Sequence, residues 1–190
     1  MITNNGTETN KIRWSFLKFY LSGITETITG VKLELQASKE GGTTTALPHA
    51  VYGLTVGEDW TESGLNFTNA PARNGKAVDM AGVFGVAALS TFNYTGAVSG
   101  NTGGPVAAVI DQAEGGLAVD FIKADSNKTV TFIIARTGDA SASGYGIAWA
   151  TDEKTYADCA APLLTVYTIP EPVTAVLLGL GGLFIERKKK

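Results

Sequence analysis

Short segments in which apolar and polar residues alternate, separated by glycine-rich turns, run through most of this chain. The clearest is Val31–Ala37 (VKLELQA), in which every second residue is apolar. Successive side chains of a β-strand point to opposite faces, so this pattern predicts a strand with one face in a core. Long amphipathic helical patterns are scarce and 23 of the 190 residues are glycine, so we expect an all-β domain with many turns.

Other segments of the same kind predict further strands. Lys128–Arg136 (KTVTFIIAR) is the strongest, because it is rich in β-branched residues. The remaining candidates are Arg13–Leu21, Val51–Val56, Thr91–Tyr94, Gly146–Ala150 and Leu163–Tyr167. Between them we expect a loop at Ser38–His49, a strand pair at Ala77–Leu89 and a short helix or turn at Leu117–Ala124. Many short strands joined by turns predict an antiparallel, jelly-roll-like β-sandwich.

Charge, cysteine and histidine content exclude several classes of protein. A net charge of −3 argues against a nucleic-acid partner, which needs a basic stripe. Cys159 is the only cysteine, so it cannot form an internal disulfide or a cysteine-based zinc cluster, and we expect it to be buried. The only histidine, His49, is predicted to lie in a loop and cannot build a multi-histidine metal site. We predict no cofactor.

No catalytic constellation stands out, so an enzyme is not predicted. The acidic pairs Asp59/Glu62 and Asp152/Glu153 are typical of solvated loops, and a glycosidase needs two carboxylates at a defined separation. Neither Ser63 nor Ser143 has the spacing of a nucleophile elbow. Calcium prefers the oxygen ligands of such loops, but Asp125 with Asn127, or Asp152 with Glu153 and Asp158, lack an EF-hand spacing. We therefore predict no metal.

One strand face offers a ligand platform. If Arg13–Leu21 is a strand, then Trp14, Phe16, Lys18 and Tyr20 share one side of it. Sugars present C–H faces that lie on aromatic rings, and their hydroxyls accept hydrogen bonds from a cation. The alternative is that another strand or loop covers these side chains as core. Trp60 is expected to pack inside the domain.

The C-terminus has three parts in a fixed order. Pro170-Glu171-Pro172 comes first, followed by the uncharged run Val173–Ile185 and the basic end Arg187, Lys188, Lys189 and Lys190. A cationic flank favours the cytoplasmic side of a membrane, so the body of the protein is expected across it. A helix over this run rises only about 20 Å against a hydrocarbon core of about 30 Å, so a C-terminal core helix is the alternative.

This tail resembles the PEP-CTERM sorting signal of exported bacterial surface proteins. The resemblance implies an exosortase-type membrane enzyme as partner, membrane anchoring before cleavage near Pro170–Pro172, and then release to the cell surface or extracellular matrix. The first residues, MITNNGT, are neither cationic nor apolar, so they do not have the pattern of a signal peptide. We therefore expect the native protein to begin further upstream, and a cytoplasmic tail-anchored protein is the alternative.

The body resembles a DNRLRE-type domain over Arg13–Tyr167. The matching strings are FLKFYLS, ITGVKLEL, VYGL, WTE, LNFTNAP, KTVTFII and APLLTV. The resemblance implies a jelly-roll β-sandwich, and some members of that group are carbohydrate-binding modules. This chain departs from the usual pattern at Tyr20, where an acidic residue is common, and at Phe67, where tryptophan is common.

Two domains and two functions are therefore predicted. Residues 1–168 are expected to form the β-sandwich, without its native first strand, and residues 169–190 the sorting tail and apolar anchor helix. The preferred function is non-catalytic binding of carbohydrate or exopolysaccharide by an exported surface protein. The alternative is a structural surface or biofilm-matrix protein without a small-molecule ligand.

Overall fold

The computed structural model describes residues 14–37, 43–66, 68–75, 77–96, 104–137, 149–150 and 159–170. Strands dominate this part of the chain, which confirms the prediction of a mostly β fold. The elements are β1 (Trp14–Tyr20), β2 (Thr27–Gln36), β3 (Thr43–Gly53), β4 (Arg73–Asn74), β5 (Ala77–Val78), the 3-10 turns η1 (Met80–Gly82) and η2 (Phe84–Val86), β6 (Ser90–Gly96), β7 (Val106–Ala113), helix α1 (Leu117–Ala124), β8 (Thr129–Arg136) and β9 (Leu163–Ile169).

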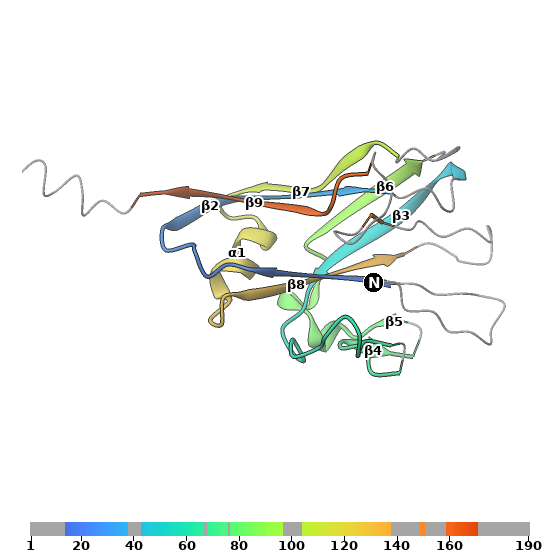
Figure 1. Cartoon of the computed structure of the whole chain (residues 1–190), viewed down its shortest axis with the longest axis horizontal. Helices are drawn as coiled ribbons and strands as arrows, with labels where there is room; N and C mark the ends of the chain where they lie inside the picture. Colours follow the sequence, from blue (N-terminus) through green and yellow to red (C-terminus); the bar gives the residue numbers. More distant parts are fainter. Residues whose placement is uncertain are drawn as a thin grey trace, which may run out of the picture.

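Two antiparallel sheets carry the fold. The first has four strands in the order β1-β8-β3-β6, the second has three in the order β7-β2-β9, and β4 with β5 forms a small separate hairpin. Figure 1 shows the two sheets as facing layers. An antiparallel β-sandwich is thus observed, while the jelly-roll connectivity stays a prediction.

The core between the sheets contains the apolar positions of the alternating segments. Val31, Leu33 and Leu35 of β2 are at most 1% exposed, and they share one cluster with Phe132 of β8. Leu33 lies opposite Ile110 of β7 and Leu164 of β9, so all three strands of the second sheet contribute to this layer. Burying each large apolar side chain contributes about 1.5–3 kcal/mol, which makes this layer the main source of stability.

Helix α1 lies between the two sheets (Figure 1). Its buried face carries Val119, Phe121 and Ile122 into the same core, and the Phe121 ring lies edge-on to Phe132 at 5.5 Å. The Ala118 amide donates a 2.7 Å hydrogen bond to Oε1 of Gln112, which satisfies one of the free N–H groups of the first helical turn. A short helix or turn was predicted over Leu117–Ala124, and the structure has a helix there.

A third layer covers the outer face of the four-stranded sheet. Strand β8 is buried on both faces from Val130 to Ala135, because alternate residues enter the core and this outer cluster. A strand covered on both sides reads as a continuous apolar run, which explains why this segment gave the strongest strand signal. The outer cluster consists of Trp14, Phe16, Leu54, Leu65, Ala70, Ala72, Val83, Ile133 and Ala135.

Two predicted segments differ in the structure, and one strand was missed. The expected loop Ser38–His49 is wrong in its second half, because β3 already begins at Thr43. Pro48 lies within this strand, opposite Asn93 of β6, and its carbonyl accepts a hydrogen bond from the Thr137 amide. Ala77–Leu89 is not a strand pair: Ala77–Val78 is its only strand, η1 and η2 follow, and Val83 between them forms an isolated bridge with Leu54. Strand β7 was not predicted.

Several predictions fall outside the described residues. These are Phe67, Asp152, Glu153 and Asp158, together with Glu171, Pro172, the apolar run Val173–Ile185 and the basic end Arg187–Lys190. In the part of the chain that the structure describes, no helix is long and apolar enough to cross a membrane.

Candidate functional site

The predicted platform on β1 divides into a buried half and an open half. Trp14 and Phe16 are each 3% exposed, whereas Tyr20 is 76% exposed and Lys18 lies between these extremes. The centroid of the Phe16 ring lies 6.5 Å from that of Trp14 and 5.9 Å from that of Trp60. The segment after β3 covers them, so the open four-residue platform is not formed, and these two rings belong to the outer cluster.

Lys18 fastens that covering segment to β1. Its Nζ donates hydrogen bonds of 2.6 Å to the carbonyl oxygens of Glu58 and Trp60, and lies 4.4 Å from the centroid of the Trp60 ring. An ammonium group has three N–H donors, so these two hydrogen bonds leave one N–H for another partner. The cation–π contact holds the charge over the Trp60 ring in addition. Trp60 is half-buried, as predicted, and its indole N–H donates to Oγ1 of Thr131 at 3.3 Å.

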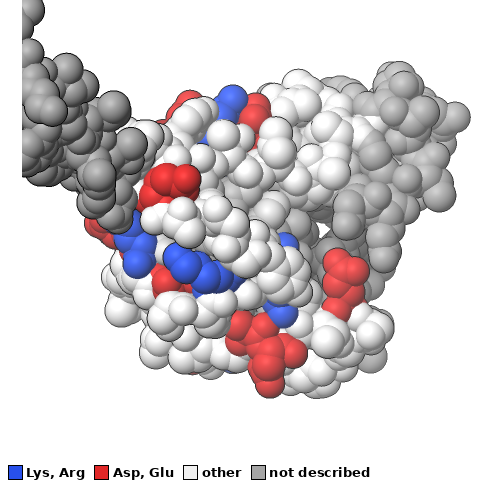
Figure 2. Space-filling model, turned by 60° about the vertical axis from the view of Figure 1, so that its left-hand side comes forward, with Lys and Arg blue, Asp and Glu red and all other residues white. Residues whose placement is uncertain are grey.

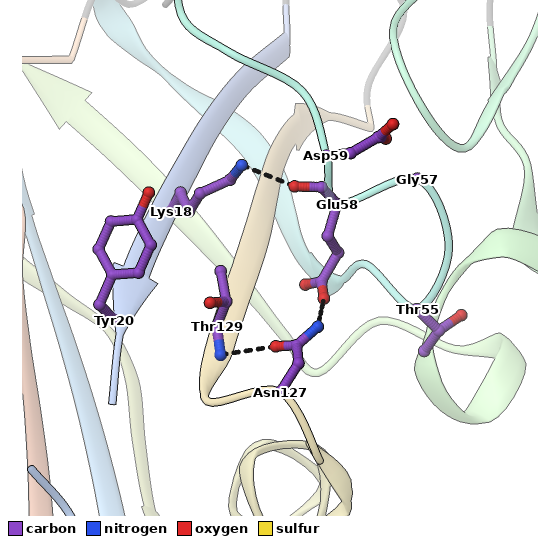
Figure 3. Close-up of a pocket in the computed structure, with 8 residues that line it drawn as sticks. All are labelled: Lys18, Tyr20, Thr55, Gly57, Glu58, Asp59, Asn127 and Thr129. Carbon is purple, nitrogen blue, oxygen red and sulfur yellow. Dashed lines mark hydrogen bonds between the residues drawn. The ribbon is translucent and has the colours of Figure 1, made fainter. Parts of the chain in front are cut away.

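An open pocket of about 650 Å³ lies beside Tyr20. Figure 3 shows Lys18 and Tyr20 on β1, Asn127 and Thr129 at the start of β8, and the loop after β3 on the opposite side. We call this the Tyr20 pocket, and it is lined by Lys18, Tyr20, Thr55, Gly57, Glu58, Asp59, Asn127 and Thr129.

The polar groups on its floor are held in place by one another. Asn127 Nδ2 donates to Oε2 of Glu58 at 3.1 Å, and Asn127 Oδ1 accepts from the Thr129 amide at 2.7 Å. The Asn127 amide is therefore held through its oxygen and one of its two N–H groups, and the Glu58 carboxylate is held through one oxygen. Figure 3 shows the Glu58 side chain turned toward Asn127 and that of Asp59 turned away from it.

The sequence pointed to only part of this pocket. Lys18 and Tyr20 came from the alternation along β1, but Glu58, Thr55 and Thr129 were not singled out. Asp59 was paired with Glu62, and Asn127 with Asp125 as oxygen ligands. In the structure Glu62 does not line the pocket, and Asn127 serves Glu58 and Thr129 instead. The side chain of Asn127 caps a turn by accepting from the Thr129 amide two positions on. A tendency of asparagine to form such turns was the only local sequence feature that could have pointed to this role.

The other singled-out residues lie elsewhere. His49 is not in a loop but in β3, 5% exposed, stacked on Phe92 at 5.2 Å. Cys159 is buried, as predicted. Among the residues that the structure describes, no three His, Cys, Asp or Glu side chains are grouped so as to hold a metal ion. Figure 2 shows basic and acidic side chains interspersed on one face, without an extended basic field.

A β-sandwich with a pocket at the edge of one sheet, lined by an exposed aromatic ring and fixed polar groups, has the form of a ligand-binding module. The sequence model of carbohydrate-binding module family 96 matches residues 1–136. This match covers well over half of the chain, which therefore belongs to that family. The matched region ends with β8, and β9 completes the second sheet by pairing with β2. No curated protein matches the chain.

Proposed function

We propose that this domain binds polysaccharide without acting on it chemically, through the Tyr20 pocket. Family membership supports carbohydrate as the class of ligand. The observation that carries the proposal is the Tyr20 ring, which is 76% exposed on the wall of a pocket whose polar floor is already fixed. An exposed aromatic ring that faces a pocket offers a flat apolar surface to a ligand, and the C–H face of a sugar can stack on such a surface.

The rest of the pocket supplies the hydrogen bonds that a sugar needs. Glu58 accepts from hydroxyl groups through the oxygen that Asn127 does not use, and the Thr55 and Thr129 side chains both donate and accept. Because Asn127 holds Glu58 before any ligand arrives, little side-chain freedom is lost on binding. The arrangement therefore orients a sugar ring stacked on Tyr20.

The test compares two exposed tyrosines. Tyr20→Ala is expected to weaken binding to a soluble polysaccharide about tenfold or more, because it removes the stacking ring. Tyr167→Ala is the matched control: Tyr167 is 48% exposed on β9 of the other sheet, outside the pocket. A glycan array identifies the binding polymers, and affinity electrophoresis then measures each variant.

Two results contradict this proposal. Equal binding by wild type and Tyr20→Ala would place the ligand elsewhere on the domain. An absence of binding to every polymer of the array by the correctly folded protein would favour the alternative, a structural surface or matrix protein without a small-molecule ligand.

We further propose that the protein is exported and sorted through its C-terminus. The support is the order of Pro170-Glu171-Pro172, the apolar run Val173–Ile185 and the basic end Arg187–Lys190.

Cleavage in a suitable host tests the sorting proposal. With a secretory signal added, a host that carries an exosortase is expected to shorten the chain near Pro170–Pro172. Replacement of Glu171 by glutamine is expected to impair that cleavage, while Glu26→Gln, in the body, leaves it intact. The mass of the mature chain shows whether and where the chain is cleaved, and a full-length product in such a host would refute the sorting proposal.

A further inference from the structure

We infer that two copies of this chain pair through β9, side by side and in opposite directions, with Val166 at the centre of the contact. β9 is the end strand of the sheet β7-β2-β9, so in the part of the chain that the structure describes only one of its two sides is paired (Figure 1). Two such edges together would make one six-stranded sheet across the two copies. The Tyr20 pocket plays no part in this contact, because it lies beside β1 and β8 of the other sheet.

The β9 edge lacks the features that usually keep sheet edges apart. Its seven residues, LLTVYTI, include no charged residue and no proline. Leu163, Tyr167 and Ile169 are 55%, 48% and 53% exposed, although all three are large and apolar. The opposite edge strand of the same sheet, β7, differs, because it carries Asp111 and lies against β6. A long, uncharged and apolar edge is a template for pairing with another strand.

The backbone shows which groups of β9 are open to a partner. The Tyr167 carbonyl points toward β2, since it accepts a 3.3 Å hydrogen bond from Oγ1 of Thr29 on that strand. The backbone groups of successive residues in a strand point to opposite sides, so those of Val166 and Thr168 point away from β2. An antiparallel partner centred on Val166 presents the same groups in return, and the two edges can therefore satisfy each other.

The side chains make a second copy of this chain a suitable partner. Antiparallel pairing about Val166 sets Leu163 opposite Ile169, Leu164 opposite Thr168 and Thr165 opposite Tyr167 of the other copy. The exposed Leu163 and Ile169 then cover each other, and an aromatic residue opposite a β-branched one is a favourable cross-strand pair. No like charges meet, because the strand has none. Twofold symmetry provides each of these pairs twice.

The contact is small, so a weak dimer is expected. Stable interfaces bury about 1,600 Å² in total, and a single pair of short strands covers less than this. We expect a dissociation constant of about 10–100 μM, in the range of transient complexes. Sedimentation equilibrium of the full chain in a mild detergent, from about 1 to 300 μM, measures the mass across this range. Wild-type protein is expected to approach twice its starting mass.

Lysines on the exposed face of β9 test the edge. The double variant Leu163→Lys/Ile169→Lys sets like charges opposite each other at both ends of the contact, and it is expected to weaken association at least tenfold. Both positions are exposed, so the fold should be retained, and circular dichroism checks this. Val106→Lys is the matched control, because Val106 is 52% exposed on β7, at the other edge of the same sheet. It is expected to leave association unchanged.

A charge reversal tests the register and direction of the pairing. In Leu163→Lys/Ile169→Glu, the new lysine of one copy faces the new glutamate of the other if the strands run in opposite directions about Val166. Association is expected to return to within about threefold of the wild-type value at low salt and to weaken at high salt. Parallel pairing would instead set like charges together in this variant.

Several results would overturn the β9 pairing. The first is the mass of a monomer at every concentration. The second is equal association of the wild type and the double lysine variant, which would assign association to another part of the chain. The third is failure of the charge reversal to restore association, which would contradict the register.

Hydrogen exchange separates pairing between copies from cover by the same chain. Exchange of the Val166 amide is expected to slow as the protein concentration rises. Slow exchange that persists at concentrations where the protein is a monomer would mean that another segment of the same chain covers the edge, and this too would overturn the pairing of two copies.

Discussion

At the scale of single residues, Gly53 shows how closely α1 and the first sheet pack. A Cβ atom at this position would lie 2.7 Å from the Phe121 ring, and Phe121 is only 4% exposed, so the ring has no free space to move into. Gly53→Ala is therefore expected to lower the free energy of unfolding by about 1–3 kcal/mol, the usual cost of overpacking a core. Urea denaturation monitored by tryptophan fluorescence measures this change.

Gly23 provides the control for that substitution. It lies in the turn between β1 and β2, and a Cβ atom there would have no neighbour within 4 Å. Gly23→Ala is expected to change the free energy of unfolding by less than about 0.5 kcal/mol. Similar losses for both variants would mean that the helix does not press on β3 as described.

His49 makes the stability of the sandwich depend on pH. Burial of the ring lowers its pKa below the usual 6.5, the neighbouring Arg136 lowers it further, and the hydrogen bond that Nδ1–H donates to the Leu47 carbonyl at 2.8 Å acts against both. The unfolded chain therefore binds the proton more readily than the folded one. His49 contributes stability that is complete above pH 6.5 and is lost as the pH falls toward the folded-state pKa.

The chain has a single histidine, so this contribution can be isolated. The thermal midpoint is expected to fall between pH 7.5 and 5.5 in the wild type and to depend less on pH in His49→Asn, measured by calorimetry at matched ionic strength. Parallel pH profiles for the two proteins would show that His49 is not the group responsible.

At the scale of elements, strand register can be tested on β2. Leu33 is 0% exposed between the sheets, so Leu33→Ala is expected to cost about 2–5 kcal/mol through the cavity it leaves. Lys32, one position away, points to solvent and pairs with Glu34 at 2.8 Å, so Lys32→Ala is expected to cost less than about 1 kcal/mol. Chemical denaturation compares the two, and equal costs would indicate a register displaced by one residue.

The elements also show what the sequence can and cannot predict. Strands with one buried face, such as β2, are predicted well, because burial of one face requires an apolar residue at every second position of the sequence. The start of strand β3 was predicted as loop because Ser38–His49 is polar and contains glycines, and its pairing with β6 along the chain from Ser90 to Gly96 is a long-range contact that no local pattern shows. β7 was missed because Val106–Ala113 is built largely from small residues, and a bulge opposite Leu33 and Glu34 breaks its alternation.

The candidate site was predicted less well than the strands. Tyr20 could be found because it continues the period of β1, whereas burial of Trp14 and Phe16 depends on a segment about 40 residues further along the chain, as the Lys18 contacts with Glu58 and Trp60 show. The bond between Asn127 and Glu58 spans 69 positions. These long-range contacts between side chains depend on how the layers of the fold stack, and no local sequence pattern predicts them.

At the scale of the whole molecule, β9 is the last strand that the described core needs. It pairs with β2 from Thr27 to Glu34, and its Leu164 and Val166 pack against the central cluster. The strand ends at Ile169, and Pro170 follows without an N–H group to extend the ladder. The sandwich should therefore be complete at this point, although the family match itself stops at residue 136.

Removal of residues 171–190 tests this boundary. We expect the thermal midpoint to stay within a few degrees of that of the full chain, since no residue of the described core is lost. Removal of residues 163–190 is the control, and it is expected to destabilise the fold severely, because it takes β9 and leaves the hydrogen-bonding groups and apolar face of β2 uncovered. Both midpoints are measured by calorimetry in a mild detergent, which keeps the apolar run of the full chain in solution. A large loss on removing 171–190 alone would mean that Val173–Ile185 packs onto the domain as a core helix, and the sorting proposal would then lose its free tail.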